Sequence, residues 1–303
     1  MLDKYIWGDV SRISPEAPVQ VVNALKETYA PGGASNVASN VSSLGANVSL
    51  YGILSKDLYS EEIKRLCQEK NISLKYFQIN RPTIVKERTI AHRQQVVRKD
   101  YGEINLEKIT LSLQDQILDS LKSEIGDYHL VILSDYDKHL FCDPLTNKII
   151  SLANSNNIPT LVDPKPINFD LFTGCRIICP NKKEAEKMSG IKYQNGNSVL
   201  MQIGSTLSQR SGAEYVIITC GEEGVFSYHE GDSLFIPTIA KQIADETGAG
   251  DTFAATLGLG FVSNLKIHDA VRLANYAAGI VVEKVGTATT TTEEILAYLN
   301  SEQ

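Results

Sequence analysis

Short apolar runs that alternate with helical patterns constrain the fold of this chain more than any other feature. The runs are rich in β-branched residues and read NVSLYGI, HLVILS, IPTLVD, CRIICP and EYVIIT. Strands that are apolar nearly throughout are covered by helices on both faces of a sheet. From the 3.6-residue periodicity we expect helices at residues 34–44, 58–70, 197–211, 251–264 and 267–284. This alternation is typical of βαβ units, so the sequence predicts an α/β fold with a mostly parallel central sheet.

Two segments, residues 9–30 and 82–103, depart from this alternation. Both alternate apolar with polar or charged residues and lack a convincing helical pattern, which is typical of strands with one face in water. We expect half-exposed antiparallel strands added to the main sheet. They form either a plain additional layer or a lid over a site, and their arginines and glutamines favour the lid. No linker or compositional break interrupts the 303 residues, so we expect one domain.

Composition and charge argue against several classes of partner. The formal net charge is -7, and the basic residues are spread among acids, which disfavours nucleic acid and anionic membranes. The five cysteines lack metal-ligand spacing and are typical of reduced core residues. No apolar run is long enough to span a bilayer, and Met1 precedes charged Asp3 and Lys4 rather than a signal-peptide core. We therefore expect a cytoplasmic protein that binds small molecules.

The stretch DETGAGDTF, residues 245 to 253, carries the first candidate chemistry. Its glycines directly precede the helix expected near Asp251, so backbone N–H groups can converge at the positive end of the helix dipole and bind an anion. Asp251 could then accept a proton from a hydroxyl while those N–H groups stabilise a transferring phosphoryl group. Alternatively, the glycines form a turn and Asp251 caps the helix. For so short a motif taken alone, we favour this second interpretation.

Three further segments carry candidate binding groups. In PGGASNVASN, Asn36 and Asn40 follow a glycine pair on one helical face, where amides suit sugar hydroxyls. In CPNKKEAE, Asn181 and Glu184 share a helical face and could hold water around Mg²⁺, or Asn181 simply caps the helix. In TCGEEG, glycines end a strand where a nucleotide could approach the backbone, or they form an ordinary turn.

The order of these motifs resembles the ribokinase-like (PfkB) sugar kinase family over nearly the whole chain. The pattern is PGGxxNVAxNxxxLG, then PNxxE, TxGxxG and TGAGD, then a helix with Asn275 in LANYAAGIVV. The resemblance implies a three-layer α/β/α fold with a small β lid, and ATP and Mg²⁺ as cofactors. It also implies a homodimer, because the exposed strand edges of the lid can pair between subunits.

Within that family, further strings are similar to the heptose 7-phosphate kinases of ADP-heptose synthesis. They are SRISPEAP, RPTIVKERTIAHRQQVVRKD, SDY, VDPK and VGTATTT. This resemblance implies transfer of the ATP γ-phosphoryl group to the anomeric hydroxyl of D-glycero-D-manno-heptose 7-phosphate. The 1,7-bisphosphate formed would serve lipopolysaccharide-core or surface-glycan precursors. Many such relatives carry a fused nucleotidyltransferase; no HxGH-type motif is present here, so we expect a separate protein to supply that step.

The resemblance also implies a role for each matching residue. Asp251 would be the general base, with an anion hole formed by Gly248, Ala249 and Gly250. Nucleotide and metal binding would fall to Asn181, Glu184 (to Mg²⁺ through water), Thr219, Gly221, Gly224 and Asn275. The sugar hydroxyls would meet Asp3, Gly32, Gly33 and Asn36. The sugar phosphate and its surroundings would meet Arg98, Lys138, Lys165 and Asp135, with Arg12 and Arg88 as further candidates. For each charged side chain, a solvated surface position is an equally good interpretation.

Two departures from the family keep alternatives open. Relatives begin with an apolar strand before the residues equivalent to Met1–Asp3, and this chain lacks it. In DYDKHLF, Asp137 and His139 stand where relatives have a small residue and glycine. Another ribokinase-like sugar or sugar-phosphate kinase therefore remains an alternative, as does a non-catalytic relative that binds a sugar phosphate. The intact Asp251 argues against the latter, since a binding protein has little need of a base.

Overall fold

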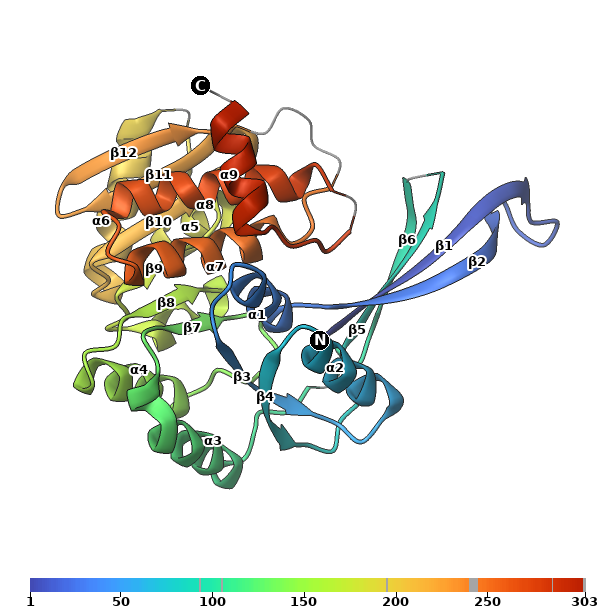
Figure 1. Cartoon of the computed structure of the whole chain (residues 1–303), viewed down its shortest axis with the longest axis horizontal. Helices are drawn as coiled ribbons and strands as arrows, with labels where there is room; N and C mark the ends of the chain where they lie inside the picture. The colour runs from blue at the N-terminus through green and yellow to red at the C-terminus, as the bar shows by residue number, and fades with distance from the viewer. Residues whose placement is uncertain (93, 105, 195, 240–244, 285, 302–303) are drawn as a thin grey trace.

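The computed structural model describes residues 1–301 except 93, 105, 195, 240–244 and 285 (Figure 1). Its largest sheet has six strands in the order β12-β11-β10-β9-β8-β7. The strands are β7 (Val131–Ser134), β8 (Thr160–Asp163), β9 (Ile177–Ile178), β10 (Tyr215–Thr219), β11 (Gly224–His229) and β12 (Asp232–Pro237). Strands β7 to β10 are parallel, and β11 and β12 add an antiparallel edge. The predicted mostly parallel sheet is thus present.

Alternate residues of these strands bury in two separate clusters, one on each face of the sheet. Val162 and Ile178 pack with helices on one face, whereas Leu161 and Ile177 pack with helices on the other. The first face is covered by α3 (Leu111–Glu124), α4 (Leu145–Ser155), α5 (Lys182–Ser189) and α6 (Asn197–Ser211). The second is covered by α7 (Ala249–Val262) and α8 (Ile267–Val282). Successive strand residues point to opposite faces, which explains the uniformly apolar runs.

The six-stranded sheet and the helices on its two faces are called the body below. The remaining helices pack around it. They are α1 (Ala34–Ser43), α2 (Leu58–Glu69) and α9 (Thr292–Ser301), with the short 3-10 helices η1 (Ile125–Asp127), η2 (Pro166–Phe172) and η3 (Gly221–Glu223). Helix α1 packs on α7, and α9 packs on α8. All five helices expected from periodicity are confirmed, with ends shifted by at most two residues. None of the helices in the described part of the chain is both long and apolar enough to cross a membrane.

The expected lid strands form a sheet of their own rather than an addition to the main sheet. Its order is β2-β1-β5-β6, and it projects from the body in Figure 1. The strands are β1 (Leu2–Ile13), β2 (Gln20–Pro31), β5 (Val85–Ala91) and β6 (Gln94–Tyr101). The prediction that these strands are all antiparallel is wrong, because the central pair β1–β5 is parallel. The inner end of β1 is buried, whereas its outer end is exposed, so the sheet is anchored at one end only.

A third, two-stranded sheet corrects another expectation. The run NVSLYGI forms β3 (Val48–Leu54), which pairs in parallel with β4 (Ile72–Gln78) and not with the six-stranded sheet. Val48 of β3 and Ile132 of β7 nevertheless contribute to the same apolar cluster. Among the described residues, β3 and β7 are therefore edge strands of neighbouring sheets.

Candidate active site

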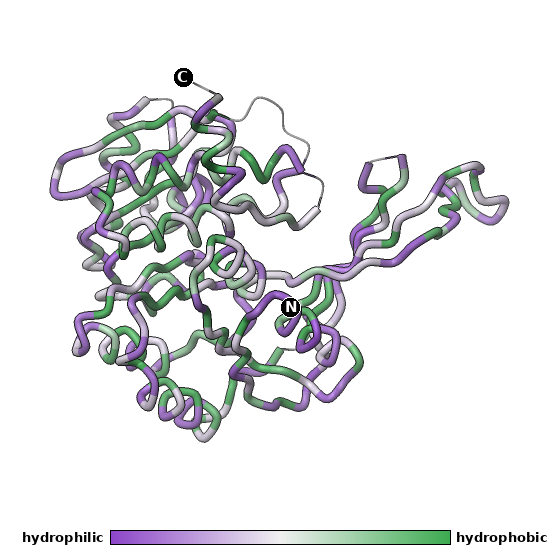
Figure 2. Tube along the Cα trace, in the orientation of Figure 1, coloured by the Kyte–Doolittle hydropathy of each residue, from purple (hydrophilic) through white to green (hydrophobic). Residues whose placement is uncertain are grey.

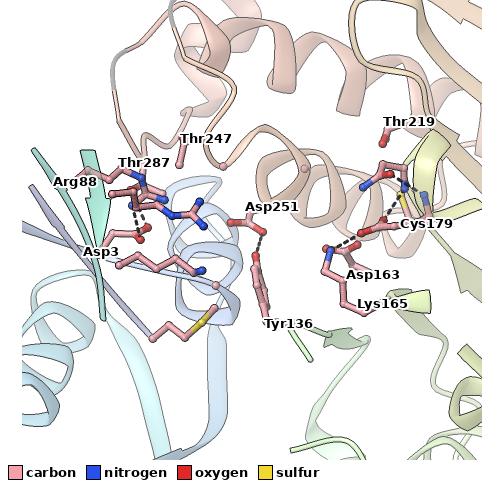
Figure 3. A pocket seen from close by; sticks show the side chains of 18 residues that line it. Asp3, Arg88, Tyr136, Asp163, Lys165, Cys179, Thr219, Thr247, Asp251 and Thr287 are labelled. Atoms are coloured by element: carbon pink, nitrogen blue, oxygen red, sulfur yellow. Dashed lines mark hydrogen bonds and ion pairs between the residues drawn. The ribbon is translucent and has the colours of Figure 1, made fainter. Parts of the chain in front are cut away.

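A cavity of about 310 Å³ lies where the lid meets the carboxyl ends of the body strands (Figure 3). The lid contributes Asp3, Lys86, Arg88 and Arg98. The body contributes Tyr136, Asp163, Lys165, Cys179, Asn181, Glu184 and Thr219. The remaining lining residues are Met1, Gly33, Thr247, Gly248, Gly250, Asp251 and Thr287. Segments from both ends and the middle of the chain thus meet in one place.

Asp251 lies in the first turn of α7 and faces the centre of the cavity (Figure 3). Its Oδ2 accepts a hydrogen bond from Asn36 Nδ2 at 2.8 Å, and its Oδ1 accepts one from the Tyr136 hydroxyl at 2.5 Å. Burial raises the pKa of Asp251 to about 6, although both hydrogen bonds oppose the shift. A carboxylate with a pKa this close to neutrality is ionised at pH 7 and is a better base than an exposed one.

The glycine-rich turn before Asp251 begins helix α7. Gly248 is its N-cap, with a left-handed φ of 86°, and a side chain there would meet Asn36 Nδ2 at 2.8 Å. Gly250 also lines the cavity. Ala249 does not, and its N–H donates to the Glu246 carbonyl at 3.3 Å. Of the three residues predicted to form the anion hole, Gly248 and Gly250 therefore face the cavity, and Ala249 does not.

Asp163 and Lys165 lie on the side of Asp251 away from the lid (Figure 3), and Glu184 lines the same cavity beside Lys165. Lys165 Nζ donates to Glu184 Oε1 at 2.5 Å. The surrounding protein withdraws Asp163 from water and raises its pKa to about 8, and the neighbouring carboxylates of Asp251 and Glu184 add to the rise. Sequence reasoning did not single out Asp163, although an acid that ends a buried strand is a usable signal. Lys165 was expected at the sugar phosphate but lies with these two acids.

Asn181 and Glu184 form a reciprocal capping box at the start of α5. The Asn181 side chain accepts from the Glu184 N–H at 3.0 Å, and Glu184 Oε2 accepts from the Asn181 N–H at 2.9 Å. The capping interpretation therefore holds for Asn181, and both residues also line the cavity. In the described part of the chain, no three His, Cys, Asp or Glu side chains gather as a metal site. Asp163 and Glu184 fit a Mg²⁺ ion that keeps several water and substrate oxygens.

Three of the expected nucleotide-binding residues do not line this cavity. Gly221 and Gly224 have positive φ, and a side chain on Gly224 would collide with the Ile236 carbonyl at 2.1 Å, so this glycine permits the β11–β12 pairing. Asn275 Nδ2 donates to the Pro237 carbonyl at 2.8 Å and ties α8 to the end of β12. Thr219, by contrast, reaches the cavity from the end of β10.

On the lid side of the cavity, Asp3 is held by Arg88 of β5 and by Thr287 near the C-terminus. Its Oδ1 accepts from Arg88 Nη1 at 2.8 Å, and its Oδ2 accepts from Thr287 Oγ1 at 3.2 Å. The glycine pair permits close approach here. A side chain on Gly32 would lie 3.0 Å from the Asp3 carboxylate, and one on Gly33, which has a φ of 59°, would meet Met1 Cε at 2.3 Å.

The cations near the lid are already paired with acids. Lys86 contacts Asp100 at 3.5 Å and Glu103 at 3.3 Å, while Arg98 contacts Asp100 at 2.9 Å. Lys138 pairs with Glu103 at 3.0 Å but does not line the cavity. Arg12 is exposed towards the outer end of β1, away from the cavity. Lys86 was not among the sequence candidates; its spacing of two residues from Arg88 on a strand places both on one face.

Asp135, expected to contact substrate, lies beneath the cavity wall instead. Its Oδ1 accepts from the Asp137 N–H at 2.8 Å. Its Oδ2 accepts from the Lys165 N–H and from Asn168 Nδ2, each at 3.0 Å. The side chain is 2 % exposed, so its role is to fasten the two loops that carry Tyr136 and Lys165. In the first loop, Asp137 and His139 adopt left-handed φ angles of 55° and 59°, where glycine is favoured.

Comparison with known proteins gives one family match and many similar structures. The model of the pfkB family carbohydrate kinases matches residues 4–294. The chain is 39% identical over 303 residues to the bifunctional protein HldE of Aliarcobacter butzleri, covering 99% of this chain and 63% of that protein. It is 40% identical over 302 residues to the HldE of Nitratiruptor sp., again covering 99% and 63%. The chain thus spans less than two thirds of the length of these relatives.

Solved structures share the fold at lower sequence identity. Phosphofructokinase-2 from Escherichia coli, in complex with potassium, aligns with a TM-score of 0.80 and 16% identity over 99% of this chain and 96% of that one. Ribokinase from Thermotoga maritima aligns with a TM-score of 0.74 and 20% identity over the same shares, 99% and 96%. The fold class predicted from the sequence is confirmed by these two structures.

Proposed function

The chain belongs to the pfkB family of carbohydrate kinases, and on that premise we propose that it phosphorylates D-glycero-D-manno-heptose 7-phosphate at the anomeric hydroxyl. The phosphoryl donor is ATP, and the product is the 1,7-bisphosphate used for ADP-heptose. One observation carries the proposal: the Asp251 carboxylate faces a cavity that has lid cations on one side and Asp163, Lys165 and Glu184 on the other. The similarity to HldE proteins supports the choice of a heptose.

Asp251 is assigned as the general base. The sugar hydroxyl loses its proton to this carboxylate while its oxygen bonds to the γ-phosphorus, and the bond from that phosphorus to the leaving ADP oxygen breaks. Phosphoryl transfer depends mainly on positioning and charge stabilisation. The start of α7, with Gly248 and Gly250, and the ammonium of Lys165 lie where they can stabilise the transferring group.

ATP and Mg²⁺ belong on the side of Asp251 that faces away from the lid. When bound, they supply the phosphoryl group and neutralise its charge. Asp163 and Glu184 would hold the ion through water, and Asn181 and Thr219 line the same wall. Lys165 Nζ donates to the Glu184 carboxylate. When it turns to a phosphate oxygen, it exchanges one anionic acceptor for another.

The sugar phosphate belongs at the lid. Lys86, Arg88 and Arg98 line the cavity there, and Arg88 is already neutralised by Asp3. Lys86 and Arg98 pair with Asp100 and Glu103, which keeps the cations ordered before a phosphate arrives. On binding a phosphate, Lys86 and Arg98 would exchange these partly exposed ion pairs, which are weak, for charge-assisted hydrogen bonds to the phosphate oxygens. This arrangement supports a phosphorylated rather than a plain sugar.

A panel of sugars and sugar phosphates with ATP and Mg²⁺ tests the proposal. We expect turnover with the heptose 7-phosphate, measured as ADP release, and a product phosphorylated at the anomeric position by ³¹P NMR. Turnover with a different sugar phosphate would reject the heptose and keep the kinase. ATP binding without turnover on any sugar would reject catalysis.

A second candidate, a kinase for another sugar phosphate, is favoured by one specific observation. The loop with Asp137 and His139 places a negative charge and an imidazole beside Lys138, and both residues are in a backbone region that favours glycine. This loop also carries Tyr136 into the cavity, so its shape affects the space for the sugar. The same substrate panel separates the two candidates.

A further inference from the structure

Tyr136 lies between the two halves of the cavity, and the proposed function assigns it no role. Its hydroxyl donates to Asp251 Oδ1 at 2.5 Å. Its ring faces the glycine pair, since a side chain on Gly33 would meet Tyr136 Cε2 at 3.3 Å. On the other side, Lys165 Nζ lies 5.9 Å from the ring centroid. One side chain therefore bonds Asp251 and lies between the lid side of the cavity and Lys165 (Figure 3).

The Asp251 carboxylate accepts one hydrogen bond on each oxygen. Tyr136 donates to Oδ1, and Asn36 donates to Oδ2. Two hydrogen bonds from different elements fix the plane of a carboxylate, which a single bond does not. A carboxylate has about four lone-pair positions, so each oxygen can still accept from a substrate hydroxyl. The phenol cannot take the opposite role, because burial raises the pKa of Tyr136 well above its ordinary value and keeps its proton in place. Tyr136 is thus a permanent donor to the base.

The backbone under Tyr136 is held firmly. Asp135, its neighbour, accepts from the Asp137 N–H on one side and from the Lys165 N–H on the other. This carboxylate joins the Tyr136 loop to the loop that carries Lys165. The hydroxyl of Tyr136 is therefore directed at Asp251 by fixed backbone as well as by ring packing.

We propose that Tyr136 is a positioning residue that, through its hydrogen bond to Oδ1, holds the Asp251 carboxylate in the orientation that accepts the sugar proton. The proposal rests on the proposed function, in which Asp251 is the base. It adds that Asp251 alone does not define the site, and that the loop after β7 sets the geometry of proton transfer.

The charges around Asp251 give the direction of a pH effect. Asp3 on β1 and Asp163 at the end of β8 oppose its ionisation, whereas Lys165, Tyr136 and Asn36 favour it. Removing the phenol hydroxyl removes one of the favourable contacts. The pKa of Asp251 then rises from about 6, and the acid limb of the kcat profile moves to higher pH.

Tyr136→Phe tests the proposal, with the substrate accepted in the panel above. Phe keeps the ring against Gly33 and loses only the hydroxyl. We expect kcat to fall about 10- to 100-fold, the range for a lost hydrogen bond to a charged group. The KM for the sugar should change less than about threefold, since binding of its phosphate involves other residues. The acid limb should move up in pH, and its position does not depend on how much of the variant is folded.

Tyr128→Phe is the matched control, because this phenol also donates to a carboxylate, Glu124 at 2.8 Å, outside the cavity. We expect wild-type kcat and pH profile for it. A wild-type kcat and acid limb in Tyr136→Phe would overturn the positioning role. If Asp251→Asn then still abolishes turnover, the proposed function stands without it. Wild-type turnover in Asp251→Asn, or no turnover of wild type with any sugar of the panel, would overturn both.

Discussion

The six-stranded body and the lid sheet both line the cavity, but they differ in how much of their surface is buried. Body strands bury both faces: Leu161 and Val162, on opposite faces of β8, are each 0% exposed. The lid exposes large apolar side chains, with Leu25 at 72% and Ile13 at 59%, and all of β6 is exposed. Figure 2 shows that both hydrophobic and hydrophilic residues occur along the projecting strands.

The body therefore owes its geometry to packing, whereas the outer lid depends mainly on strand pairing. The difference teaches that the body positions Asp251 and its neighbouring acids by packing, while the lid positions its cations by ion pairs, such as those of Lys86 and Arg88.

The largest expected effect compares one leucine from each region. Leu161→Ala in the body should lower the free energy of unfolding by about 2 to 5 kcal/mol, because it leaves a cavity between β8 and the helices. Leu25→Ala in the lid should change it by less than about 0.5 kcal/mol. Urea denaturation followed by circular dichroism measures both. Equal losses would mean that the lid packs as the body does.

The next effect falls on Asp251, the proposed base, which the body holds. Asp251→Asn keeps the shape of the side chain but cannot accept a proton, so kcat should fall at least about 100-fold. Steady-state kinetics with saturating ATP and sugar measures it. Asp115→Asn, on the exposed face of α3, is the control and should behave as wild type. A kcat above a tenth of the wild-type value would remove Asp251 from the role of base.

A smaller effect is expected for the lid cations. Lys86→Met should raise the KM for the sugar phosphate about tenfold, because it removes a cation and leaves Asp100 and Glu103 to repel the phosphate. The KM for ATP should stay within about twofold, since the nucleotide is proposed to bind on the other side of Asp251. Lys26→Met, which changes an exposed lid cation outside the cavity, should change neither. A rise in the KM for ATP alone would place the sugar phosphate elsewhere.

The smallest expected effect concerns association. We propose that the lid sheets of two subunits pair, because β2 and β6 are edge strands with exposed apolar side chains such as Val97. Val97→Asp should weaken the homodimer about tenfold, since a carboxylate would enter an apolar contact. Light scattering over a dilution series measures the dissociation. A wild-type protein that is monomeric at all working concentrations would contradict the dimer.

Much of the fold followed from local pattern, and the gaps have physical reasons. The five expected helices carry clear apolar periodicity, and Asn181 was considered as the cap of a further helix, which the structure has as α5. Helix α3, capped by Thr110, was missed, as were α4 and α9. Most residues of α3 are polar, so tertiary packing decides its conformation more than its own pattern does. The lid pairing was partly wrong for a similar reason: alternation predicts a strand but not its partner, and β1 lies parallel to β5.

The site was less predictable than the fold. Asp251 and the glycine pair stood out because their motifs are contiguous. The sequence did not point to Tyr136, Asp163 or Lys86, because each matters only through residues that are distant in the chain. Tyr136 and Asp251, for example, are 115 positions apart. Asp135 shows the converse. It lies in a promising motif, yet its carboxylate points at backbone N–H groups beneath the cavity.

By itself, the sequence determined the alternation of apolar strands with helices, five of the helices, the place of the α7 start and the acid in its first turn, because these depend on neighbouring residues and helix geometry. The tertiary structure alone decided which side chains share the cavity. Hydrogen bonds of the kind that join Asn36 and Tyr136 to Asp251 act only at contact distance. That distance is set by how the sheets and helices pack, and no local pattern in the chain encodes it.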